Sequence, residues 1–527
     1  MNYSKTLLAF CFACSFYFLA IGQHTNVLIS NTNFPEEPSI CINPKNTQEL
    51  VAGANIDHVY YSHNGGETWT KNTLTCSWGV WGDPVIGIDT TGAFYFLHLS
   101  NPPTSGNWID RIIAQKSTDG GVTWNNGSFM GLNGSKAQDK HWIATDWKTN
   151  HLYVTWTQFD KYGSALATDS SIILFSKSID GGANWSAAKR INKLAGDCVD
   201  SDLTAEGAMP CVGPNGEVYV AWSNRNKLWF DRSTDGGNTW LSEDIFVGDQ
   251  PGGWDYSIAG IDRANGLPVT SCDTSGGAYH GTIYINWSDQ RNGANNTDIW
   301  LSKSTDGGNT WSAAVKVNDD ATTRQQFFTW MAIDQKTGWL WFVFYDRRNY
   351  QGIQTDVYMA VSKDGGTTFQ NFKVSESPFI PSAGTFFGDY TNITAHNNVV
   401  RPIWTRLSNG DLSVWTALVK PEALLVNATQ PDGAAAAFSI EALYPNPSLD
   451  LTAFSFKLRH RSLVNLYLVD LQGKVRSQLI DNEWRDTGKH VESIDQDQLG
   501  LSAGAYFVVL SVDGIIARRK VMFLGNE

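Results

Sequence analysis

The sequence is poor in charge and in cysteine, and it has only one long apolar run. Charged residues make up 17% of the 527 residues, and 39 basic residues against 52 acidic ones give a formal net charge of −13. Nucleic-acid binding needs a basic surface, so no nucleic-acid partner is expected. Low charge combined with 13% aromatic residues also excludes a coiled coil or a disordered chain. The 48 glycines and 22 tryptophans favour an all-β chain with many tight turns.

The one long apolar run lies near the N-terminus, from Thr6 to Ile21, behind Lys5 and ahead of Gly22. This order of charge, apolar run and small residues is typical of a cleaved secretory signal peptide, so residues 1–22 are interpreted as one. A membrane anchor is the alternative, but the run is shorter than a spanning helix needs. No other stretch is long and apolar enough to span a membrane.

Two of the seven cysteines lie in this leader, so five follow it and at least one thiol stays unpaired. Cys198 and Cys211 are the only pair close in sequence, and an oxidising compartment could join them. After residue 22 there is no cysteine or histidine spacing of the kind that binds zinc.

One octapeptide, of the form Ser-x-Asp-Gly-Gly-x-Thr-Trp, recurs six times. The copies begin at Ser62, Ser117, Ser178, Ser233, Ser304 and Ser362. The Asp accepts hydrogen bonds from the amides that follow, and the Gly pair supplies positive φ, so each copy predicts a hairpin turn. Repeats of about 50 residues built from short strands indicate a β-propeller.

This octapeptide resembles the Asp box, or BNR repeat, of the sialidase-like superfamily, and the resemblance covers about residues 26–420. Each blade should open with a segment that begins its first strand, here called the opening of the sheet. Within 23–420 seven such openings can be aligned, the fifth of them at Asp255–Asp262, so seven blades are favoured over the six of sialidases proper. The last blade has no box of its own. Asn26–Ser30 is placed to supply its fourth strand and to close the ring.

After Lys420 the composition changes to small residues, and 421–440 are interpreted as a linker. Alternating strands follow at 453–457, 464–469 and 505–510, which predict a separate β-sandwich over 441–527. Its Leu443–Pro447, Asp470–Lys474 and Arg518–Met522 segments resemble the type IX secretion sorting domain of Bacteroidetes. The resemblance implies the type IX machinery as a partner and a protein that is secreted, or attached to the outer-membrane surface, by way of the periplasm. The protein is expected to be a monomer. An accessory carbohydrate-binding sandwich is the alternative.

Propeller geometry places the start of each first strand and the end of each second strand on one face, with the octapeptides on the other. Acidic residues converge on the first face, which is the arrangement that general acid and base catalysis needs. The candidate catalytic residues there are Glu206, Asp83, Tyr256 and Tyr390, and the candidate substrate contacts are Glu37, Asp139, Lys140, Arg291, Arg347, Trp142 and Trp330. Acids that bind loop amides, arginines that lock loops and tryptophans that pack between blades are the structural alternatives.

Sialidases of this superfamily have an arginine triad and an early Arg-Ile-Pro sequence, whereas this chain has the acidic opening Phe34–Glu37 in that place. The leading hypothesis is a glycoside hydrolase with two carboxylates, acting on an extracellular glycan, with acidic glycans among the candidates. A polysaccharide lyase with Tyr390, His141 or Lys140 as base, and a non-catalytic propeller that binds glycan or protein, are the alternatives. No cofactor is expected. A structural Ca²⁺ ion bound in the central channel is another explanation for the acidic residues that converge there.

Overall fold

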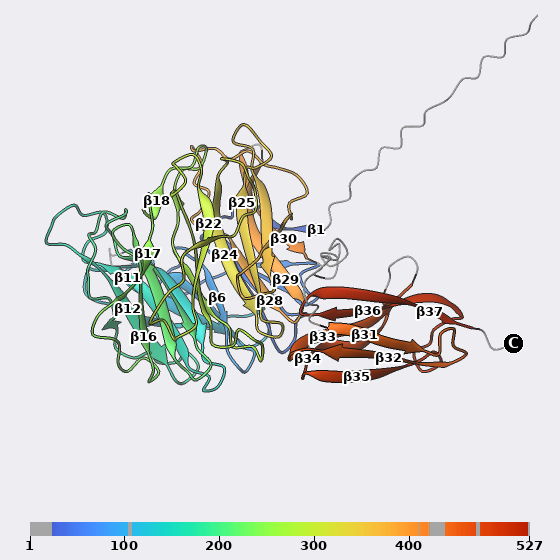
Figure 1. Cartoon of the computed structure of the whole chain (residues 1–527). Helices are drawn as coiled ribbons and strands as arrows, with labels where there is room; N and C mark the ends of the chain where they lie inside the picture. Colours follow the sequence, from blue (N-terminus) through green and yellow to red (C-terminus); the bar gives the residue numbers. More distant parts are fainter. Residues whose placement is uncertain are drawn as a thin grey trace, which may run out of the picture.

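The computed structural model describes residues 24–103, 108–408, 410–419, 421, 438–470 and 475–524. The predicted signal peptide and most of the predicted linker lie outside these residues. Every regular element in the described part of the chain is a β-strand (Figure 1). No helix in that part is long and apolar enough to cross a membrane.

Seven four-stranded antiparallel sheets follow one another in the first 418 residues. Sheet one consists of β2 (Ser39–Ile42), β3 (Leu50–Ala54), β4 (His58–Ser62) and β5 (Thr70–Thr73). Sheet two consists of β6 (Val85–Ile88), β7 (Phe94–Leu99), β8 (Ile112–Ser117) and β9 (Ser128–Met130). Sheet three consists of β10 (Ala137–Thr145), β11 (Leu152–Phe159), β12 (Ser171–Ser178) and β13 (Lys189–Arg190). Sheet four consists of β14 (Glu206–Val212), β15 (Val218–Ser223), β16 (Lys227–Ser233) and β17 (Ile245–Asp249). Sheet five consists of β20 (Val269–Cys272), β21 (Ile283–Asp289), β22 (Asp298–Ser304) and β23 (Val315–Lys316). Sheet six consists of β24 (Gln326–Asp334), β25 (Trp339–Asp346), β26 (Asp356–Ser362) and β27 (Gln370–Lys373). Sheet seven consists of β28 (Asn392–His396), β29 (Val399–Ser408), β30 (Asp411–Leu418) and β1 (Thr25–Ser30).

The first strands of these sheets form a closed ring. Each contacts the next in the order β2, β6, β10, β14, β20, β24 and β28, and β28 contacts β2 again. Strand β1 closes the ring because it pairs with β30, with Val27 opposite Thr416. The pairing that the sequence predicts for Asn26–Ser30 is therefore present, and it covers the edge that β30 would otherwise expose. The ring of radiating sheets is a β-propeller.

The octapeptides form the turns between third and fourth strands. In all six, the second Gly donates its N–H to the Ser hydroxyl at 2.8–2.9 Å. The Asp carboxylate, or the Asn64 amide in the first copy, accepts the N–H of the seventh residue. Hydrogen bonds from the side chains of Asn184 and Thr310, followed by these backbone bonds, lower the pKa of Asp180 and of Asp306 to about 2. The octapeptides are thus local turn units at the end of the propeller opposite the sheet openings.

Packing between sheets comes from the second strands, which are buried on both faces. Large aromatic side chains in these strands have no exposed surface or almost none, among them Trp156, Trp222, Trp287, Trp341 and Trp404. Burial on both faces explains why the second strands are continuous apolar runs and not alternating ones.

The predicted opening of sheet five was wrong. Asp255–Asp262 does not enter the ring, because β18 (Asp255–Tyr256) pairs with β19 (Ala264–Asn265) in a separate hairpin. The first strand of sheet five is β20, which lies further along the chain and has the short, half-polar sequence Val-Thr-Ser-Cys. Ile258 and Ile261 are buried beneath the hairpin, so their apolar spacing imitates that of a ring strand.

The pairing of Cys198 with Cys211, which the sequence leaves open, does not form, since all five described cysteines are free thiols. Cys198 lies in the loop before β14 and forms a β-bridge with Ser164, whereas Cys211 lies near the far end of β14. The two residues are therefore separated by most of the length of one strand.

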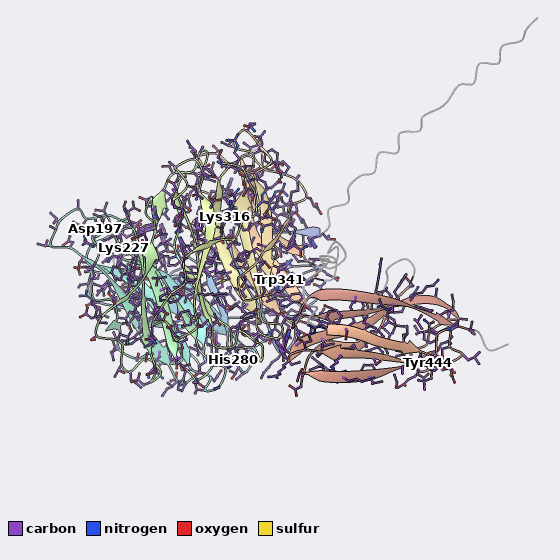
Figure 2. The ribbon with its side chains drawn as sticks, viewed as in Figure 1. Asp197, Lys227, His280, Lys316, Trp341 and Tyr444 are labelled. Atoms are coloured by element: carbon purple, nitrogen blue, oxygen red, sulfur yellow. The ribbon has the colours of Figure 1, made fainter. Side chains whose placement is uncertain are left out.

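Residues 438–524 form a second body with two sheets around one apolar core. Its strands are β31 (Phe438–Tyr444), β32 (Leu451–Leu458) and β35 (Gly488–Asp495) in one sheet, and β34 (Val475–Arg485), β33 (Ser462–Val469), β36 (Gly504–Val512) and β37 (Ile515–Phe523) in the other. This body lies at the octapeptide end of the propeller, where Trp484 packs against Gly277 and a cavity of about 450 Å³ remains between the two bodies. In Figure 2, Asp197 and Lys227, beside the openings of the sheets, lie far from this body, while His280 lies near it. The openings are left uncovered by the second body.

Candidate functional site

The side chains at the sheet openings converge on the axis because the first strands begin with an irregularity. Register shifts follow Asp139, Glu206 and Phe327. Glu37, Asp83, Lys140 and Phe328 adopt φ values of 48–52°, which non-glycine residues rarely do. Bulges of this kind re-aim side chains and are frequent beside active sites.

Lys140 lies at the centre of this end of the channel. Its Nζ is 2.7 Å from Asp389 Oδ2 and 3.3 Å from Asp83 Oδ2, so one cation joins sheets two, three and seven. Arg263, in the loop before sheet five, donates to both carboxylate oxygens of Asp389 through Nε and Nη2, and its Nη1 lies 3.7 Å from Asp200 Oδ2. Lys140 and Arg263 hold the pKa of Asp389 well below its usual range, and Lys140 is the chief cause of the lowered pKa of Asp83.

Glu36 and Glu37 belong to the same cluster. Asn55 donates to Glu37 at 2.6 Å and to Glu36 at 3.1 Å, and the Asp389 N–H donates to Glu37 at 2.9 Å. Burial and the charges of Asp389 and Asp83 raise the pKa of both glutamates well above the ordinary value. The predicted substrate contact Glu37 is thus buried and satisfied, and it helps to hold the cluster together.

Glu206 differs from the other acids. It is completely buried, and neither carboxyl oxygen has a hydrogen-bond donor among the described residues. Burial, followed by the nearby carboxylates of Asp200 and Asp139, raises its pKa well above the ordinary value. Asp200 is partly exposed, and the Tyr162 hydroxyl donates a hydrogen bond to it at 2.5 Å.

Asp139 makes stability depend on pH. Burial, only partly offset by Lys140, raises its pKa from 3.8 to about 8. The folded state therefore keeps a proton on Asp139 that the unfolded chain releases at lower pH. The contribution of Asp139 to the free energy of unfolding consequently falls as pH rises from 3.8 to about 8. We expect Asp139→Asn, which can still accept the Lys140 N–H, to unfold at a higher temperature than the parent at about pH 8.

The measurement is the melting temperature of both proteins by circular dichroism from about pH 5 to pH 8. The difference should grow with pH. A constant difference would mean that Asp139 is ionised in the folded state.

Aromatic side chains close the channel beneath the charged cluster. Trp142 lies 4.5 Å from Trp330 and 5.4 Å from Tyr390 between ring centroids, and all three are buried. The cavity that remains beside them has a volume of about 20 Å³. That volume admits a water molecule and no sugar ring. These three residues, predicted to contact substrate or to act in catalysis, form the floor of the site instead.

Three more predicted site residues lie outside the cluster. The Tyr256 hydroxyl is buried and bonds to Asn265 O and Ser288 Oγ. Arg291 pairs with Asp289 and stacks on Trp300, and Arg347 is buried against Thr355 and Gln325. The two arginines lock neighbouring loops, so neither guanidinium is available to a substrate carboxylate. His141, the predicted lyase base, is fully buried with a pKa lowered to about 4 by burial.

Sequence analysis missed Arg263, Asp200 and Tyr162. All three lie in loops before or after a strand, where the octapeptide alignment assigns no position. The only feature of the sequence that could have pointed to these three residues is that each is polar and lies close to the opening of a sheet. Among the described residues, no three His, Cys, Asp or Glu side chains are grouped so as to hold a metal ion.

Three solved structures illustrate what the chain is similar to. A Hadza microbial sialidase is 15% identical, with a TM-score of 0.41 over 71% of this chain and 74% of the other. An α-L-arabinanase of Penicillium chrysogenum is 15% identical, with a TM-score of 0.40 over 64% and 97%. An ulvan lyase of polysaccharide lyase family 25 is 11% identical, with a TM-score of 0.47 over 74% and 95%.

No curated protein matches the chain. The family model that does match is the BNR/Asp-box repeat, at residues 60–71. This segment contains the first of the six octapeptides, so the chain carries the BNR/Asp-box repeat.

Proposed function

We propose that the protein is an extracellular glycan-active enzyme, a seven-bladed propeller that hydrolyses glycosidic bonds at the sheet openings. The observation that carries the proposal is a pair of acids at the sheet openings whose pKa values are shifted in opposite directions. Burial raises the pKa of Glu206, which has no hydrogen-bond donor among the described residues, well above its ordinary value, whereas Lys140 lowers the pKa of Asp83. Titratable groups whose surroundings push their pKa values apart are the acid and base of glycoside hydrolysis.

Glu206, whose raised pKa favours the protonated form, is the source of the proton that such a reaction delivers. Asp200 is partly exposed and Glu206 is not, so the proton reaches the leaving oxygen through Asp200. Asp83, the ionised acid, takes the proton of the attacking water. Tyr162 orients Asp200 through its hydrogen bond.

Two features support the export route in this proposal. The leader of residues 1–22 has the order of a signal peptide, and the second body has the segments of a type IX sorting module. The second body contacts the octapeptide end of the propeller and so leaves the proposed site open to solvent.

The test is to incubate the purified protein with a panel of neutral, sialylated, sulfated and uronate-containing glycans. New reducing ends and the absorbance of unsaturated products are recorded together. We expect reducing ends without unsaturation. Unsaturated products would indicate a lyase, and glycan binding without any cleavage would indicate a binding propeller.

A further inference from the structure

A row of aromatic side chains leads from the surface to the carboxyl pair. Trp81 is 38% exposed and Trp108 is 41% exposed, with their ring centroids 6.1 Å apart. Trp108 lies 5.4 Å from Tyr162, whose hydroxyl bonds to Asp200. The row is therefore continuous with the proposed catalytic pair.

All three side chains belong to the end of the propeller where the sheets open. Trp81 precedes β6, Trp108 lies in the loop from β7 to β8, and Tyr162 follows β11. Other tryptophans of the propeller, such as Trp156 and Trp404, fill the spaces between sheets and have no exposed surface. Two neighbouring tryptophans that stay exposed contribute little to the core and offer flat apolar faces for a ligand.

The charges around the row disfavour an acidic ligand. Arg111 pairs with Asp110 through two bonds of 2.8 Å, and Lys136 pairs with Asp160 at 2.7 Å. At the axis, Lys140 pairs with Asp83 and Asp389, and Arg263 pairs with Asp389 and lies near Asp200. These four cations are therefore already occupied by acidic side chains and are not left for an anionic sugar, whereas a neutral sugar needs no cation.

We propose that Trp81 and Trp108 form a stacking platform for a neutral oligosaccharide, and that the substrate extends over it from Asp200 by more than one sugar ring. This inference rests on the proposed function for the position of the cleaved bond. The stacking itself does not require catalysis.

The test compares Trp108→Ala and Trp81→Ala with the parent protein. Trp147→Ala is the matched control, because Trp147 is 49% exposed but lies at the octapeptide end. Neutral arabino-, xylo- and manno-oligosaccharides of increasing length, with oligogalacturonides as the acidic series, are titrated by calorimetry. For any neutral series that binds, we expect affinity to rise with length in the parent and to fall by about tenfold for the longer members in either variant. The control should match the parent.

The outcomes separate the two proposals. Length-dependent binding that depends on Trp108 but occurs without cleavage would refute the hydrolase and leave the platform standing. Cleavage with the same KM for long substrates in parent and variants would refute the platform and leave the hydrolase standing. Tighter binding of the acidic series, or no binding of any neutral series, would overturn the platform. Trp108→Phe, which keeps a ring, should restore most of the affinity and so guards against a misfolded alanine variant.

Discussion

Replacing Glu206 with Gln is expected to lower kcat by about two to four orders of magnitude on any glycan that the protein cleaves. Gln has the shape of the acid but no proton to deliver to the neighbouring Asp200. Because Glu206 acts protonated, the activity of the parent should fall as pH rises through its raised pKa. The remaining activity of the variant should lack this decline.

Steady-state kinetics across pH provide the measurement, with Asp83→Asn as the companion variant and Asp249→Asn as the control. Asp249 is an exposed acid on the same end of the propeller, and its loss should leave kcat unchanged. Asp83→Asn should remove the acidic limb of the profile, since Asp83 acts ionised. Full activity in Glu206→Gln would show that the buried acid has no part in the chemistry.

Lys140→Met is expected to lower the free energy of unfolding by about 3–5 kcal/mol near neutral pH, because it leaves buried carboxylates without their cation. Lys140 is buried and contacts Asp389 and Asp83, which belong to two other sheets, so the loss also loosens the ring. The lowered pKa values of these two acids mean that their contribution to stability is present above their unfolded pKa. That contribution is lost as pH falls through the folded pKa values, so the difference between variant and parent should shrink in acid.

Denaturant unfolding at neutral and acidic pH measures this difference, and Lys45→Met, at an exposed surface lysine, is the control. An unchanged midpoint at neutral pH would show that the acids around Lys140 are already neutral in the folded protein. A difference that grew in acid would contradict the lowered pKa values.

The octapeptides and the closing strand were predictable from sequence because their chemistry is local or strictly repeated. Within each octapeptide the Ser, the Asp and the second Gly lie four residues apart or fewer, and their hydrogen bonds need nothing beyond the turn. The missing fourth strand of the last sheet likewise followed from the count of strands. Only the first strand of sheet five was mispredicted, because the buried loop around Ile258 and Ile261 has the apolar spacing of a ring strand while β20 does not.

The site itself was determined only in part by the sequence. The sequence alone placed Glu206, Asp83, Asp139 and Lys140 at the sheet openings, since position along a strand determines which end of the propeller a residue occupies. Only the closed ring decided that Lys140 joins Asp83 to Asp389, that Trp142 and Tyr390 block the channel, and that Arg291 turns away to Asp289. It also brought Tyr162 to Asp200 from a different loop. The physical reason is that contacts across the axis depend on the radius and tilt of the whole ring, to which every sheet contributes and which no single segment encodes.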